Sequence, residues 1–353
     1  MSSREHRNPA DPISEMLLPR HYGSTPTLFG APRVRTAQEL AGSDLAFLGI
    51  PWSAPIPDSR LGSAAANYSG TALTPQAFRA SSIKYGGYLP ELEIDVFERL
   101  RLVDCGDSQI YQDMDRTLSD VETRVGGIID AGAIPITMGG NAGPSSYPVL
   151  KAIAARAGGP AAVVNFDAHH DNMRGDWQDD SPELPRWGST WARRILDLPG
   201  VDPARYFHVG LRGPRNDPGV FDRFLEKGVT RDHIYTFRHV LAARGRGFEA
   251  WAEELSMEAV TGAARVWIAV DPDVLDMADS PDFGDEPLGL HTEELCWLAH
   301  EVGRAAGRAR FGGISFMAVP NTASGIHWIC VYVLLYALAG ILESEAGPRA
   351  PLA

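Results

Sequence analysis

The chain has 353 residues, of which 44% are hydrophobic, and its formal net charge is −13 with a pI of about 5.2. This length is sufficient for a packed core, and the acidic balance argues against nucleic acid or an anionic membrane surface as a partner. Cys105, Cys296 and Cys330 have no CxxC spacing, which favours reduced cysteines in a cytoplasmic protein over a disulfide or a thiolate site.

The two ends of the chain have contrasting compositions. The first 33 residues are rich in Pro, Arg and Ser without an apolar signal core, so we expect an N-terminal arm over residues 1–38 and a single domain over 39–353. Near the C-terminus, the apolar run 328–342 stops at Glu343, short of the roughly 20 residues that span a bilayer. It predicts a buried closing helix.

Between these ends, apolar runs that end in Asp, Gly or Pro alternate with segments of helical spacing. The predicted strands are 44–52, 99–107, 133–140, 162–167, 206–213, 265–273 and 311–320. The predicted helices include 74–83, 119–132, 218–228 and 248–260. This alternation predicts βαβ units and one parallel sheet covered on both faces, with its ligand site at the carboxyl ends of the strands.

The stretch VVNFDAHHDN (163–172) places charged and polar side chains directly after a buried strand. Because side chains alternate along a strand, Asp167, His169 and Asp171 are expected to start on one face and His170 on the other. His170 is therefore interpreted as a structural residue.

A second acidic cluster, Asp271, Asp273 and Asp276, follows the strand RVWIAV. A single Asp at a strand end is often a turn or helix cap, but two such clusters are harder to explain as caps. If the carboxylates of both clusters lie about 5 Å apart, each pair repels by roughly 3 kcal/mol at an effective dielectric of about 20. That repulsion is large beside a typical stability of about 5–15 kcal/mol. Carboxylates with an imidazole suit Mn²⁺, Fe²⁺, Ni²⁺ or Zn²⁺, so the pattern favours a divalent metal site.

These motifs resemble those of the ureohydrolase superfamily of arginases, agmatinases and guanidino-acid hydrolases. The resemblance spans about residues 40 to 345 and rests on DLAFLGIPW, MGGNAGPS, NFDAHHD, VDPDVLDMADSP and PLGLHTEEL. It implies a three-layer α/β/α sandwich with a mainly parallel sheet of about eight strands. It also implies two Mn²⁺ ions, bridged by a hydroxide that attacks a guanidinium carbon, and assembly into trimers or hexamers.

Carried over to this chain, the resemblance assigns one metal to Asp167, His169, Asp271 and Asp273. The second metal would use Asp167, Asp171 and Asp271, but Ala142 stands where the family has its histidine ligand. One firmly held ion per chain is therefore favoured over two. Mn²⁺ is the preferred ion, with Ni²⁺, Fe²⁺ and Zn²⁺ as alternatives.

Other departures affect the substrate pocket, which we expect to include Asn141, Ala142, Asn172, Trp187 and Met317. Trp187 aligns with a histidine that shuttles protons in the family, and Met317 with a glutamate that pairs with the guanidinium. A buried guanidinium without a carboxylate partner is expensive, so ordinary arginase or agmatinase activity is disfavoured.

His291, in GLHTEEL, and Asp276 are the candidate catalytic acid or base residues, and a cap or surface role is the alternative for His291. Two functions remain open at this point. The chain is either an atypical metal-dependent hydrolase of a C–N bond in a guanidino- or amidino-type small molecule, or a non-catalytic partner or regulatory subunit of an active paralogue. We expect a homo-oligomer, a trimer or hexamer, and the non-catalytic alternative would add association with the active paralogue.

Overall fold

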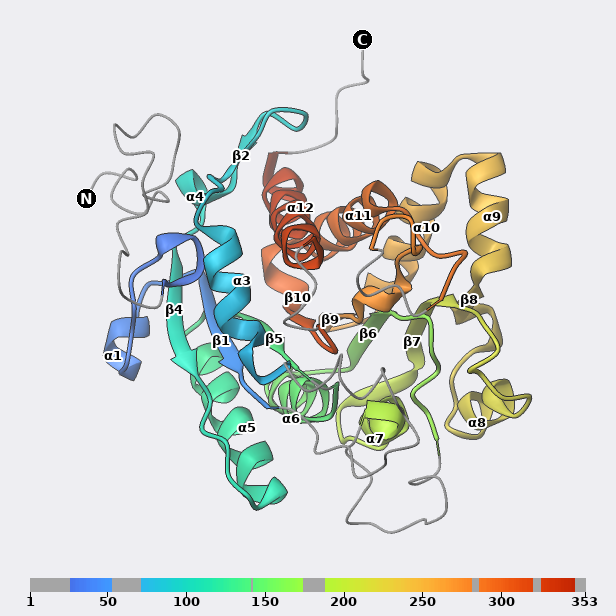
Figure 1. Cartoon of the computed structure of the whole chain (residues 1–353), viewed down its shortest axis with the longest axis horizontal. Coiled ribbons are helices and arrows are strands. Elements are labelled where there is room, and N and C mark those ends of the chain that lie inside the picture. Colours follow the sequence, from blue (N-terminus) through green and yellow to red (C-terminus); the bar gives the residue numbers. More distant parts are fainter. Residues whose placement is uncertain are drawn as a thin grey trace.

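The computed structural model describes residues 26–52, 71–140, 142–173, 188–280, 286–319 and 325–346. Its centre is an eight-stranded sheet in the order β4-β1-β5-β10-β9-β6-β7-β8, and all neighbouring strands are parallel (Figure 1). The strands are β1 (Leu45–Ile50), β4 (Leu102–Asp107), β5 (Ile134–Gly139), β6 (Ala161–Phe166), β7 (Val201–Leu211), β8 (Ile234–Thr236), β9 (Arg265–Val270) and β10 (Phe311–Phe316). A separate antiparallel pair consists of β2 (Tyr88–Leu89) and β3 (Ile94–Asp95).

Helices cover both faces of the sheet. One layer contains α3 (Thr74–Ser82), α4 (Val96–Arg99), α9 (Phe237–Arg246), α10 (Phe248–Val260), α11 (Thr292–Arg310) and α12 (Ile326–Ala346). The other contains α1 (Ala37–Leu40), α5 (Met114–Asp130), α6 (Ala142–Ala154), α7 (Trp191–Ile195) and α8 (Val220–Glu226). This arrangement confirms the predicted three-layer α/β/α fold.

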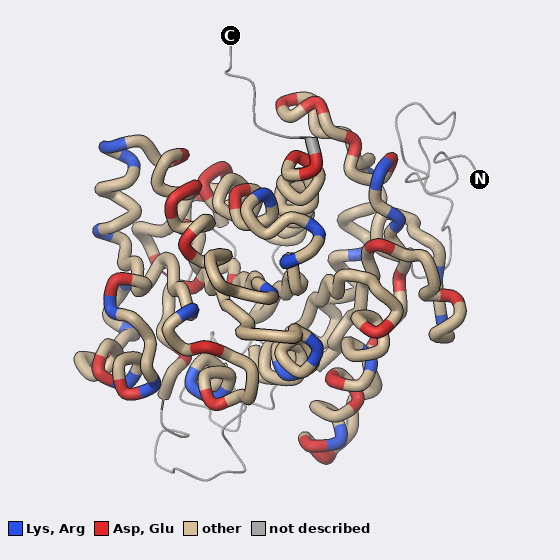
Figure 2. Tube along the Cα trace, turned by 180° about the vertical axis from the view of Figure 1, so that it is seen from behind, with Lys and Arg blue, Asp and Glu red and all other residues tan. Residues whose placement is uncertain are grey.

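The alternation of side chains along each strand creates the two cores. In β1, Leu45 and Phe47 pack into the core with α3 and α12, whereas Ala46 and Leu48 pack into the core with α5 and α6. Both faces are therefore apolar, as expected for a parallel sheet enclosed by helices. Lys, Arg, Asp and Glu lie mostly on the outer helices and turns, with both signs interspersed (Figure 2).

Two elements differ from the sequence prediction at the far edge of the sheet. Strand β7 already begins at Val201, ahead of the predicted 206–213, and the edge strand β8 was not predicted. Strand β8 contains only the three residues Ile-Tyr-Thr, too few for a periodic pattern to be recognised. It forms because β7 offers an unpaired edge to it.

The N-terminal residues that the structure describes pack against the domain. Leu28 and Phe29 are buried, and the Leu28 N–H donates to Asp104 Oδ2 at 2.9 Å. Asp104 is fully buried and also accepts from Arg79 Nε at 2.8 Å and from Arg33 Nη1 at 3.0 Å. The packed part of the chain therefore starts before residue 39. Asp104, a residue of β4, holds this segment to the sheet through its bonds with Leu28 and Arg33.

Helix α12 is the predicted closing helix. By length and composition alone its segment Ile326–Glu345 could cross a membrane, but 72% of its most apolar window is buried inside the protein. It packs along α11 and contacts α3 and α4, so its apolar side chains complete one of the two cores. The core helix of a folded domain has these same properties.

Candidate metal centre

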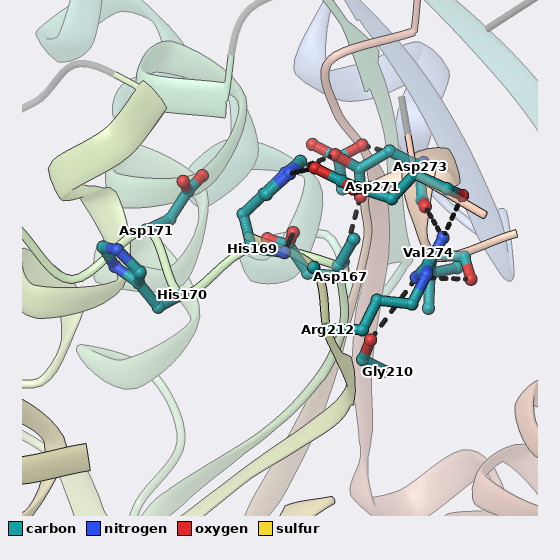
Figure 3. Close-up of polar contacts among 12 residues, drawn as sticks. Asp167, His169, His170, Asp171, Gly210, Arg212, Asp271, Asp273 and Val274 are labelled. Atoms are coloured by element: carbon teal, nitrogen blue, oxygen red, sulfur yellow. Dashed lines mark hydrogen bonds and ion pairs between the residues drawn. The ribbon is translucent and has the colours of Figure 1, made fainter. Parts of the chain in front are cut away.

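Two neighbouring strands bring the predicted acidic clusters together. Strands β6 and β9 are parallel and in register, with Phe166 opposite Val270 as the last pair. The segments that follow these two residues therefore begin side by side at the carboxyl edge of the sheet, where open α/β sheets bind ligands. Asp167 and His169 follow β6, and Asp271 and Asp273 follow β9 (Figure 3).

Asp167, His169 and Asp273 form the tightest group. One potential ligand atom of each lies within 4.8 Å of the other two. His169 Nδ1 is 2.8 Å from Asp273 Oδ2, while the other carboxylate oxygen of Asp273 accepts the Ala168 N–H at 3.0 Å. Asp167 Oδ1 accepts the His169 N–H at 2.7 Å. Its Oδ2 is buried and has no hydrogen-bond partner among the described residues.

Asp271 lies beside Asp273 in Figure 3 and is also buried, with 4% of its surface exposed. It caps the short 3₁₀ helix Pro272–Val274, and its Oδ1 accepts the Asp273 N–H at 3.1 Å. Its own N–H donates to Phe166 O at 2.9 Å, which extends the β6–β9 pairing by one bond. The Asp-Pro-Asp turn thus holds both carboxylates near the end of β6.

The electrostatics of the group favour a cation. Burial, and then the charges of Asp273, Asp171 and Asp271, raise the pKa of Asp167 well above its ordinary value. Burial also acts to raise the pKa of Asp273, but the charge and hydrogen bond of His169, together with the Ala168 N–H and the charge of Arg212, outweigh it and lower that pKa. The same ion pair raises the pKa of His169 against the effect of burial.

The residues present therefore fit a divalent metal ion. A buried carboxylate oxygen without a partner, two further carboxylates and one imidazole are a donor set that suits Mn²⁺ and related ions. An ion bound here would satisfy Asp167 Oδ2 and offset the negative charge that burial makes costly.

Asp171 does not join this group, contrary to the expectation from strand alternation. The strand ends at Phe166, and Asp171 has a left-handed backbone conformation with φ of +41°, so the period of two does not extend to it. Its Oδ2 accepts the indole N–H of Trp191 at 2.8 Å, and in Figure 3 its carboxylate lies apart from Asp167 and Asp273. Burial raises the pKa of Asp171 to about 7.

His170 lies on the far side, near Asp171 in Figure 3. Its Nδ1 accepts the Asn172 N–H at 3.1 Å, and its Nε2 is 3.6 Å from Asp217 Oδ2. Burial, followed by the charge of Arg223, lowers the pKa of His170 to about 4, so the ring is neutral at pH 7. These contacts are those of a structural histidine.

The predicted pocket residues have different surroundings. Ala142 is buried at the start of α6, and Met317 is fully buried in an apolar core just after β10. The side chain of Asn172 turns to α8, where it donates to Val220 O at 3.2 Å and accepts from Arg223 Nε at 3.0 Å. Asn141 and Trp187 lie outside the described residues.

The two acid or base candidates stabilise backbone around the second acidic cluster. Asp276 accepts the Ala278 N–H at 2.9 Å and the Gly289 N–H at 3.0 Å. His291 precedes the first residue of α11, its side chain is 44% exposed, and its Nδ1 lies 2.9 Å from Asp279 Oδ2. None of these contacts includes Asp167, His169 or Asp273.

Two residues at the site were missed in the sequence. Arg212 follows β7, and its buried guanidinium donates to six backbone carbonyls at 2.7–3.4 Å, those of Gly210, Asp273, Val274, Leu275, Glu286 and Pro287. Figure 3 shows it beneath the acidic turn. The second residue is Glu286, whose Oε1 lies 3.5 Å from His169 Nε2. The only available signal was the position of Arg212 at the same sheet edge as the acidic clusters.

Comparison with known proteins places this geometry in a family. Residues 43–311 match the model of the Arginase family. The chain is 28% identical over 273 residues to an agmatinase of Chromobacterium violaceum, and the aligned region covers 76% of this chain and 74% of the relative. It is 26% identical over 312 residues to a formimidoylglutamase of Bacillus subtilis, and this aligned region covers 84% of this chain and 86% of the relative.

Solved structures show the same fold. The crystal structure of the Bacillus subtilis formimidoylglutamase superposes with a TM-score of 0.71 at 24% identity, over 88% of this chain and 90% of that one. Trypanosoma cruzi formiminoglutamase, crystallised with Mn²⁺, gives a TM-score of 0.71 at 18% identity, over 90% of this chain and 98% of that one. The match to the family model covers more than half of the sequence, and the chain therefore belongs to the Arginase family.

Proposed function

We propose that this protein is a hydrolase that uses one firmly held divalent metal ion to cleave a C–N bond in an amidino- or guanidino-type small molecule. The observation that carries the proposal is the buried group of Asp167, His169 and Asp273, in which Asp167 Oδ2 has no partner within the described part of the chain. Similarity to an agmatinase and a formimidoylglutamase supports the substrate class. The Mn²⁺ in the Trypanosoma cruzi structure supports manganese as the ion.

Asp167, His169, Asp271 and Asp273 would hold the ion. Bound there, a divalent metal would lower the pKa of a coordinated water toward about 7 and polarise the substrate. The chain itself positions these ligands: Ala168 N–H and the Arg212 guanidinium fix the side chain and the backbone of Asp273. The position of Asp171 supports one ion over two, because a second site would need its carboxylate, which lies apart from Asp167 and Asp273 beside Trp191.

Met317 supports a substrate other than a simple guanidinium. Its side chain is fully buried among apolar residues and offers no negative charge. Met317 stands where the resemblance has the glutamate that pairs with the guanidinium, so a guanidinium bound at this site would lose its water without gaining that ion pair. We therefore infer a substrate that is larger, less charged or able to supply its own counter-charge.

Metal content tests the first half of this proposal. Wild-type protein purified without chelators should contain about one transition metal ion per chain by elemental analysis. His169→Ala should lose the metal, Asp171→Ala should retain most of it, and the exposed His239→Ala serves as a matched histidine control. Near-zero metal in the wild type after incubation with Mn²⁺ would overturn the proposal, and equal loss from His169→Ala and Asp171→Ala would indicate a two-metal centre.

Substrate turnover tests the second half. The Mn²⁺-loaded protein is incubated with agmatine, guanidino acids and formimidoyl-glutamate, and the release of urea, formamide and amine is measured. Metal-dependent release from one class, lost in His169→Ala, supports the hydrolase. Tight metal binding without turnover on any of them favours the alternative, a non-catalytic partner or regulatory subunit. Co-purification from the native host then identifies an active paralogue, and light scattering tests the expected trimer or hexamer.

A further inference from the structure

The buried carboxylate of Glu286 faces the side of His169 that the acidic group does not use. Glu286 Oε1 lies 3.5 Å from His169 Nε2, and the Glu286 side chain is only 7% exposed. The other ring nitrogen, Nδ1, is 2.8 Å from Asp273 Oδ2. The imidazole therefore lies between two carboxylates, one at each nitrogen. Within the described ranges, His169 is the one ion-pair partner of Glu286.

The position of Glu286 is built into the site. Nη2 of Arg212 donates to Glu286 O at 2.9 Å and to Asp273 O at 2.7 Å, so one guanidinium fixes the backbone of both carboxylates that flank His169. Gly213, with φ of +81°, leaves room for the Glu286 carboxylate, because a Cβ at this glycine would lie 2.6 Å from Glu286 Oε2.

A neutral imidazole carries one N–H and one lone pair, and its neighbours determine which nitrogen has the proton. A buried carboxylate needs a donor, so Glu286 favours a proton on Nε2 of His169. In the metal-free protein Nδ1 carries the proton that it shares with Asp273, and a metal ion would take the place of that proton. The lone pair of Nδ1 then faces the ion, and the remaining ring proton is on Nε2. Histidine ligands of metals usually donate their second ring N–H to a carboxylate or carbonyl, which fixes the tautomer and raises the basicity of the ligand nitrogen.

We propose that Glu286 is a positioning residue of the metal centre, which holds His169 as the Nε2–H tautomer and so presents Nδ1 to the ion. The inference rests on the proposed function, because it assumes that His169 is a metal ligand. Glu286 acts through His169 and does not itself bind the ion.

The test compares two carboxylate–histidine pairs in the same protein. Glu286→Met removes the acceptor beside His169 and keeps a similar volume, and Glu286→Gln keeps the shape without the charge. Glu258→Met is the matched control, because the exposed Glu258 places Oε1 3.0 Å from Nε2 of His233, which precedes β8 and so lies at the opposite edge of the sheet from the acidic group. The dissociation constant for Mn²⁺ is measured for each protein by competition with a chelating dye.

We expect Glu286→Met to weaken Mn²⁺ binding about 10–100-fold, Glu286→Gln to weaken it less, and Glu258→Met to leave it unchanged. A second readout is the ring tautomer of His169, observed by long-range ¹H–¹⁵N NMR with diamagnetic Zn²⁺. With Zn²⁺ on Nδ1 the ring proton is on Nε2, and Glu286→Met, which lacks the acceptor for this proton, should exchange it with solvent faster than the wild type does.

The outcomes separate this inference from the proposed function. If the wild type binds metal and Glu286→Met has the same affinity within twofold and the same exchange rate of the His169 Nε2 proton, the role of Glu286 is refuted and the metal site stands. If the wild type binds no metal, both proposals are refuted. A loss of affinity that Glu258→Met reproduces also refutes a specific role for Glu286.

Discussion

Replacement of Asp167 by Asn should change the stability of this protein in opposite directions with and without metal. Asp167 is fully buried, its Oδ2 has no hydrogen-bond partner in the part of the chain that the structure describes, and a ligand oxygen of Asp273 lies within 4.8 Å. In the metal-free protein the buried carboxyl of Asp167 lowers the stability of the folded state. With an ion present it becomes a ligand.

The size of the cost follows from the geometry. Two like charges at this separation repel by about 3 kcal/mol at an effective dielectric of about 20. Uptake of a proton is the alternative, and at pH 8 it also costs free energy. Asn keeps the acceptor for the His169 N–H and replaces the unpartnered Oδ2 by an uncharged amide N–H₂ group, which no longer repels the neighbouring carboxylates. The metal-free variant should therefore be about 1–3 kcal/mol more stable than the metal-free wild type.

With bound metal, the wild type should instead be more stable than Asp167→Asn. Free ion at 100 times its dissociation constant stabilises the wild type by about 2.7 kcal/mol, whereas the variant lacks the charged ligand and gains little. The assay is urea unfolding at pH 8, in EDTA and in MnCl₂, with the surface variant Asp120→Asn as a control that should respond to metal like the wild type. The reasoning is refuted if Asp167→Asn is less stable than the wild type in EDTA, or if Mn²⁺ stabilises both proteins equally.

The same residue sets a pH dependence. Because the pKa of Asp167 is raised in the folded state, the folded protein binds this proton more tightly than the unfolded chain does. The metal-free wild type should therefore lose stability as pH rises above about 4 and through the folded pKa of Asp167. In EDTA, Asp167→Asn should show a flatter profile over that range, and an unchanged slope would contradict the assignment.

Further predictions concern the residues that support the site and the fold. Trp191→Phe removes the donor to half-buried Asp171 and should lower the free energy of unfolding by about 1–3 kcal/mol in urea, whereas no change would show that this bond is unimportant. Arg212→Lys cannot reproduce the six carbonyl contacts and should weaken Mn²⁺ binding at least tenfold in a dye competition, with retained affinity as the contrary result. Arg79→Met leaves Asp104 buried without its main partner and should cost about 3–5 kcal/mol, measured by thermal unfolding; a smaller loss in Arg79→Met than in Trp191→Phe would contradict this.

Much of the fold can be read from the sequence because its cause is local. Apolar runs of strand length that end in Asp, Gly or Pro, alternating with helical spacing, predict parallel strands enclosed by helices. The length of the run 328–342 predicts that α12 is a core helix, and its burial agrees. The short strand β8 carries no such pattern, and only the edge of β7 makes it a strand.

For the candidate site, too, some positions can be predicted from the sequence and others cannot. Strand ends alone predict that Asp167, His169, Asp271 and Asp273 share one edge of the sheet, because parallel strands present their carboxyl ends together. The position of Asp171 could not be predicted, because alternation holds only while the backbone remains extended, and the chain leaves that conformation after Phe166. The contacts of His291 match the cap alternative that the sequence left open.

The sequence by itself determined the layers of this protein and the chemistry available at its sheet edge, since both depend on residue types at short spacing. Only the tertiary structure decided which of those groups meet. The register of β6 with β9 sets the distance from His169 to Asp273, and the contact between His169 and Glu286 joins residues that are 117 positions apart. Such contacts depend on the path of the loop that follows β9. Arg212 holds this loop against the end of β7 through the backbone carbonyls of Asp273 and Glu286, and a pattern of side chains in the sequence does not reveal bonds to carbonyls.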